Sequence, residues 1–145
     1  SRLSTFYRMA EQKGLSIPDA YIKEAAYRNA DETYERTREL LELEDRPTCI
    51  LYQDDFASFG GIKAIRQAGL KIPQDISVAG YDGIRIAYQL EPQLTTLKQD
   101  TESIGRLAAE QLISLIEEPK TTLIRPYIVE GYVEKGQSVR DINHT

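Results

Sequence analysis

Two short stretches decide the fold: Cys49-Ile50-Leu51-Tyr52-Gln53-Asp54-Asp55 and Ile76-Ser77-Val78-Ala79-Gly80-Tyr81-Asp82-Gly83. In each, a mainly apolar run is followed directly by acidic residues. Runs of this kind are typical of strands that are buried on both faces, as in parallel sheets. A helix predicted from Phe56 to Ala68 and closed by Gly69 lies between them. The two stretches are therefore expected to be neighbouring parallel strands.

The rest of the chain continues this alternation of helices and strands. Helical spacing of apolar residues predicts three further helices: Leu3 to Ala10 with Gly14 as C-cap, about Asp31 to Leu43, and a strongly amphipathic one from Thr101 to Ile116 capped by Asp100. Further strands are expected around Glu24–Tyr27, at Thr95–Lys98 and within Leu123–Val133. The sequence thus predicts an α/β fold with a mainly parallel sheet and helices on both faces.

Composition excludes several functional classes. The 145 residues include 18 Lys and Arg against 23 Asp and Glu, and the net charge of −5 disfavours a free-standing nucleic-acid binder. No apolar run is long enough for a membrane helix. The single cysteine, Cys49, can form no internal disulfide, and the single histidine, His144, is next to last. A histidine-based nucleophilic apparatus and a Cys/His zinc site are therefore disfavoured.

Carboxylates follow both decisive strands. Asp54 and Asp55 come after the first strand, and Asp82 comes after the second. In open α/β sheets, ligands bind outside the carboxyl ends of the strands. The sequence therefore predicts a site for a polar ligand at this edge.

The chain opens on a helix, although an α/β unit normally begins with a strand, and Ser1 is not an initiator methionine. The sequence is therefore expected to be a piece of a longer protein.

Three segments at these spacings closely resemble the LacI/GalR family of bacterial transcription repressors, which small molecules control. They are Pro47-Thr48-Cys49-Ile50, Ile72-Pro73-Gln74-Asp75-Ile76-Ser77-Val78-Ala79-Gly80-Tyr81-Asp82 and Leu94-Thr95-Thr96-Leu97-Lys98-Gln99-Asp100. The resemblance covers about Arg2 to Val139. It implies a type I periplasmic-binding-protein-like fold, in which an effector binds between two α/β lobes.

The same resemblance implies a domain division. Residues 1–145 would form a partial effector-binding domain, mostly the C-terminal lobe, with about 99–118 belonging to the N-terminal lobe. The helix-turn-helix and most of the N-terminal lobe would be absent.

The resemblance also implies effector contacts at Arg2, Asp54, Asp82 and Gln99. The family's stacking aromatic comes from the segment near Tyr27, but an ungapped count reaches Arg28 instead, so both are candidates. Asparagine is common in the family at position 54, and aspartate lacks its donor. Acidic acceptors with one cation suit a polyhydroxylated ligand, tolerate an amino sugar and disfavour a sugar phosphate.

Ordinary structural roles remain open for these residues. Asp82 can simply start a turn with Gly83, and Asp54 or Asp55 can cap the following helix. Tyr27 can serve packing, and Gln99 can satisfy backbone groups.

The resemblance implies a cytoplasmic sensing domain whose partners are a sugar effector, operator DNA through a domain absent here, and a second copy in a homodimer. It implies no cofactor and no membrane partner.

A solute-binding protein of a sugar transporter is the alternative with the same fold. A glycosidase using Asp54 and Asp82 is a weaker alternative, since nothing in the sequence shows a raised carboxyl pKa or the required separation. A carboxylate metal site is weak too, because Arg2 would compete for the same charges.

Overall fold

The structure is a computed structural model that describes residues 2–142, so His144 lies outside the described residues. Its sheet has the order β1-β2-β3-β4. The strands are β1 (Cys49–Leu51), β2 (Ser77–Asp82), β3 (Thr95–Lys98) and β4 (Tyr132–Glu134). The first three are parallel, with Ile50 beside Val78 and Gly80 beside Thr96, and β4 is antiparallel to β3. The predicted mainly parallel sheet, with the two decisive strands adjacent, is confirmed.

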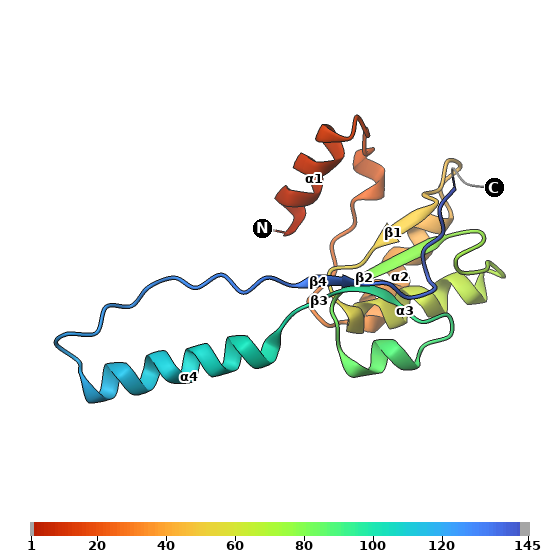
Figure 1. Cartoon of the computed structure of the whole chain (residues 1–145). Helices are drawn as coiled ribbons and strands as arrows, with labels where there is room; N and C mark the ends of the chain where they lie inside the picture. Colours follow the sequence, from red (N-terminus) through yellow and green to blue (C-terminus); the bar gives the residue numbers. More distant parts are fainter. Residues whose placement is uncertain (1, 143–145) are drawn as a thin grey trace.

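Helices lie on both sides of this sheet (Figure 1). They are α1 (Arg2–Gln12), α2 (Ala30–Leu41), α3 (Asp55–Gln67) and α4 (Thr101–Glu117), with short 3₁₀ turns η1 (Asp19–Tyr21) and η2 (Arg85–Gln89). The helices α2 and α3 pack closely against each other, and α3 also packs on β2. A Cβ at Gly60 of α3 would overlap the Ala30 carbonyl of α2, so glycine permits this close packing.

The core lies between the sheet and the α2–α3 pair. Ile65, Ile76, Val78 and Leu94 are fully buried there. The other buried members of the cluster are Leu40, Ile50, Tyr52, Ile62 and Ala87. Because Ile50 and Val78 are paired across parallel strands, their side chains point to the same face of the sheet. This apolar face fixes the register that brings the carboxyl ends of the strands together.

Two sequence predictions about strands need correction. No strand forms at Glu24–Tyr27; residues 22–26 follow η1 without a ladder partner. Within Leu123–Val133, only the last two residues belong to a strand, which is β4. Both segments have strand-like composition, but composition creates no ladder where no neighbouring strand offers its backbone.

The helix α4 and the segment after it extend away from the sheet (Figure 1). Asp100 caps α4 as predicted, since its Oδ1 accepts from the Ser103 amide at 3.0 Å. No residue of α4 is buried, and Leu112, Ile113 and Ile116 are exposed. Its apolar stripe thus has little cover from residues 2–142.

Candidate functional site

Asp82 lies at the centre of the candidate site. It ends β2 with φ of 112°, a conformation that is rare for a residue with a side chain, and Gly83 follows at φ of 69°. Its carboxylate accepts from Gln99 Nε2 at 2.6 Å, Tyr27 Oη at 3.3 Å and Arg2 Nη2 at 3.4 Å. Backbone strain of this kind gathers at functional sites. The structure therefore brings four of the predicted site residues together around one carboxylate.

Arg2 attaches the start of α1 to the carboxyl edge of the sheet. Its Nη1 donates to the Gln53 carbonyl at 2.6 Å, and its guanidinium lies 3.7 Å from the centroid of the Tyr81 ring. Its side chain is 46% exposed, whereas that of Asp82 is 18% exposed. An ion pair this open to water contributes little to stability. Both charges therefore remain available to a ligand.

Asp54 is placed differently from the other predicted site residues. It is 1% exposed and caps α3, with Oδ1 accepting from the Ala57 amide at 2.7 Å. Its Oδ2 accepts from the Arg28 amide at 3.2 Å. Both oxygens are therefore used to start a helix and to hold the loop that carries Tyr27. A direct ligand contact by Asp54 stays a prediction.

Asp55 is fully buried and joins three segments. Its Oδ1 accepts from the Thr96 hydroxyl at 2.6 Å, and its Oδ2 accepts from the Ile84 amide at 2.9 Å. Burial raises the pKa of this carboxyl, and the hydrogen bonds from Thr96 and the backbone only partly offset that effect. Asp55 thus connects the start of α3 to β3 and to the turn that follows Asp82.

Tyr27 and Arg28 occupy the loop before α2. Tyr27 is 60% exposed. Its ring is therefore not packed in the protein interior, which was the structural alternative to a ligand role. Arg28 has φ of 56°, and its guanidinium lies 5.5 Å from the centroid of the Phe56 ring. The Tyr27 hydroxyl therefore belongs to the Asp82 cluster, whereas the Arg28 guanidinium lies over Phe56. Which of them stacks on a ligand stays a prediction.

Sequence reasoning missed two members of the site. Tyr81 supplies the ring under Arg2, and Gln53 binds Arg2 through its carbonyl while its side-chain Nε2 donates to the Ala26 carbonyl at 2.8 Å. Each directly precedes a predicted aspartate in the sequence. Their place at the carboxyl ends of adjacent strands is the signal that could have found them.

The arrangement is suited to binding rather than to proton transfer. One carboxylate with several spare lone pairs, one guanidinium, one amide and one phenol can share hydrogen bonds with a hydroxyl-rich molecule. Within residues 2–142, no three His, Cys, Asp or Glu side chains are grouped to hold a metal ion. No described helix is long and apolar enough to cross a membrane.

A mainly parallel sheet with a polar cluster at its carboxyl edge defines a ligand-binding lobe of the α/β type. The chain belongs to the family of periplasmic-binding-protein-like domains, whose model matches residues 1–139. The transcriptional repressor PurR of Escherichia coli O1:K1 is 30% identical over 133 residues, covering 89% of this chain and 39% of that protein. The resemblance to the LacI/GalR family is thereby confirmed.

Solved structures agree with this assignment. A LacI-family regulatory protein from Chloroflexus aggregans has a TM-score of 0.83 at 26% identity, covering 96% of this chain and 50% of that one. A LacI-family regulator from Enterococcus faecium with bound ribose has a TM-score of 0.71 at 29% identity, covering 77% of this chain and 40% of that one. The chain spans about half or less of the length of these relatives.

Proposed function

We propose that this chain is part of an effector-sensing domain of a LacI-type transcription regulator, mostly its C-terminal lobe. The observation that carries the proposal is the Asp82 cluster, in which Arg2, Tyr27 and Gln99 converge from three other segments. The relative matched by sequence is a transcriptional repressor, which supports a regulator rather than a transport protein or an enzyme.

The effector is a neutral, polyhydroxylated molecule, in the first place a sugar. The two longest bonds to Asp82, at 3.3 and 3.4 Å, come from exposed side chains, and sugar hydroxyls can replace them at little cost. A phosphate group would meet the Asp82 carboxylate, so a sugar phosphate is disfavoured. The regulator from Enterococcus faecium was solved with ribose, and one from Arthrobacter was solved with lactose.

Signal transmission requires parts of a longer, cytoplasmic protein. Residues 99–118, which include α4, belong to a second lobe, and the exposed apolar stripe of α4 packs there. A homodimer converts the angle between the lobes into the spacing of two DNA-reading heads at the operator. A coupling of about 1–3 kcal/mol would change operator affinity about 5–150-fold.

Isothermal titration of the longer protein with ribose, lactose and ribose 5-phosphate tests the proposal. We expect a neutral sugar to bind and the phosphate to bind more weakly. Asp82→Ala removes a charged acceptor that contributes about 1.5–3 kcal/mol, so affinity should fall roughly 10–150-fold. Asp31→Asn, at an exposed carboxylate of α2, is the matched control and should leave affinity unchanged. Equal affinity in a folded Asp82→Ala protein would overturn the site.

A further inference from the structure

The carboxylate of Asp82 is engaged by three donors of the chain itself. Its Oδ1 accepts from Gln99 Nε2 at 2.6 Å and from Arg2 Nη2 at 3.4 Å, and its Oδ2 accepts from Tyr27 Oη at 3.3 Å. Because two donors already use the lone pairs of Oδ1, Oδ2 is the oxygen left for a ligand hydroxyl. Only 18% of the Asp82 side chain is exposed, so a ligand hydroxyl and the Tyr27 phenol meet at the same oxygen.

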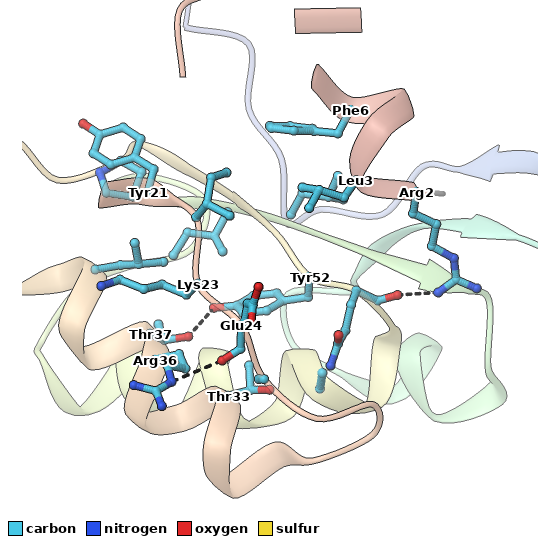
Figure 2. Close-up of a pocket in the computed structure, with 18 of the residues that line it drawn as sticks. Arg2, Leu3, Phe6, Tyr21, Lys23, Glu24, Thr33, Arg36, Thr37 and Tyr52 are labelled. Carbon is cyan, nitrogen blue, oxygen red and sulfur yellow. Dashed lines mark hydrogen bonds between the residues drawn. The ribbon is translucent and has the colours of Figure 1, made fainter. Parts of the chain in front are cut away.

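The bond from Tyr27 is the one that a ligand hydroxyl can replace most readily. It is longer than the bond from Gln99, and 60% of Tyr27 is exposed. Arg2 has two further contacts, because its Nη1 donates to the Gln53 carbonyl at 2.6 Å beside the cavity shown in Figure 2 and its guanidinium lies over the Tyr81 ring. Within residues 2–142, the Tyr27 hydroxyl makes no second hydrogen bond. Displacing the phenol therefore breaks a single weak bond.

The main chain on both sides of Tyr27 is fixed, so displacement requires the movement of one side chain only. Gln53 Nε2 donates to the Ala26 carbonyl at 2.8 Å, and the Arg28 amide donates to Asp54 Oδ2 at 3.2 Å. Arg28 has φ of 56°, a conformation that is rare for a residue with a side chain and persists where surrounding contacts hold it. The phenol can therefore rotate away from the carboxylate while the loop keeps its shape.

We propose that the Tyr27 hydroxyl competes with the effector for Asp82 and thereby lowers the affinity of the sensor. This competition rests on the proposed function, in which Asp82 binds a neutral sugar. A sugar hydroxyl that donates to Oδ2 replaces the phenol, so part of the binding free energy is used to break the bond from Tyr27. A stacking aromatic has the opposite effect, because its removal weakens binding. The phenol oxygen and the ring of Tyr27 therefore act on affinity in opposite directions.

Tyr27→Phe separates the two effects, because it removes the donor and keeps the aromatic surface. Isothermal titration of the longer protein with ribose and with lactose measures the change. For whichever of these sugars the parent binds, we expect Tyr27→Phe to bind about 2–10-fold more tightly, since one exposed hydrogen bond no longer has to be broken. Tyr34→Phe is the matched control: it removes a phenol hydroxyl that donates to Gln67 Oε1 at 2.6 Å, between α2 and α3, and should leave affinity unchanged.

A second background tests whether the competition is for Asp82 itself. In an Asp82→Ala protein the phenol has no carboxylate to bind, so adding Tyr27→Phe should change the sugar affinity by less than about 2-fold. A gain of the same size in both backgrounds would show that the hydroxyl acts elsewhere, and the competition for Asp82 would be refuted.

The remaining outcomes also have distinct meanings. An unchanged affinity in a folded Tyr27→Phe protein would show that the hydroxyl does not compete, and a weaker affinity would show that it binds the sugar itself. Either result would overturn the competition while leaving Asp82 as a ligand contact. If the parent bound neither ribose nor lactose, the proposed neutral-sugar effector would be refuted, and the competition with it.

Discussion

Asp55 provides the sharpest test of how the site is held in place. Its carboxylate is fully buried and accepts hydrogen bonds from the Thr96 hydroxyl and the Ile84 amide. Asp55→Ala would leave both donors without this acceptor in the protein interior. Each buried unsatisfied group costs about 1–3 kcal/mol, so the free energy of unfolding should fall by about 2–6 kcal/mol. That is a large share of the roughly 5–15 kcal/mol typical of a domain.

Asp55→Asn is the matched variant, because its amide oxygen can still accept from Ile84 and its amide nitrogen can donate to the Thr96 hydroxyl. We expect the free energy of unfolding to fall much less in Asp55→Asn than in Asp55→Ala. Urea unfolding followed by circular dichroism at neutral pH measures both variants. An Asp55→Ala protein within about 0.5 kcal/mol of the parent would refute the hydrogen-bond reasoning.

The pH dependence of stability checks the same carboxylate independently. Burial raises the folded-state pKa of Asp55 above its ordinary value of 3.8, so the folded protein holds this proton more tightly than the unfolded chain. The contribution of Asp55 to stability therefore falls as pH rises from about 3.8 to the folded pKa, and then stays constant. Relative to the parent, Asp55→Asn should gain stability across that window. If the difference in free energy of unfolding between Asp55→Asn and the parent stayed constant across this pH window, the raised pKa of Asp55 would be contradicted.

Three further substitutions probe the scaffold, each by urea unfolding. Asp54→Ala removes the cap of α3 and should cost about 0.5–2 kcal/mol, while Asp54→Asn should retain most of it; equal losses would argue against capping. Gly60→Ala forces a methyl group into the Ala30 carbonyl and should cost about 1–3 kcal/mol, and a stabilised variant would contradict the close α2–α3 packing. Ser138→Ala removes a buried hydroxyl that binds the Val78 carbonyl at 2.6 Å and should cost about 1–3 kcal/mol, whereas Ser138→Thr should lose less.

The part of the fold that the sequence could predict depends on local signals. The two decisive strands each end in acidic residues and are joined by one helix, so neighbouring parallel placement follows from chain connectivity. That placement brought the segments of Asp54 and Asp82 to one edge, as expected. The cap of α4 at Asp100 was equally local, because it involves an amide three residues away.

The different structural roles of Asp54 and Asp55 could not be predicted in the same way. Both are acidic, adjacent and compatible with a helix start. Asp54 caps α3, which is a local role, whereas Asp55 binds a hydroxyl 41 residues later in the chain. Only the assembled sheet places Thr96 beside the start of α3. The prediction of a strand at Glu24–Tyr27 was wrong for a related reason, because a strand forms only where a neighbouring strand pairs with it.

The contacts of Arg2 link the start of α1 to ligand binding. Arg2 is the first residue of α1, and its guanidinium binds both the Gln53 carbonyl and the Asp82 carboxylate. Because the Arg2 side chain is 46% exposed, the ion pair holds the guanidinium only weakly in place. An interaction that orders the start of α1 would position the guanidinium before the ligand arrives, and affinity would gain from the smaller ordering cost.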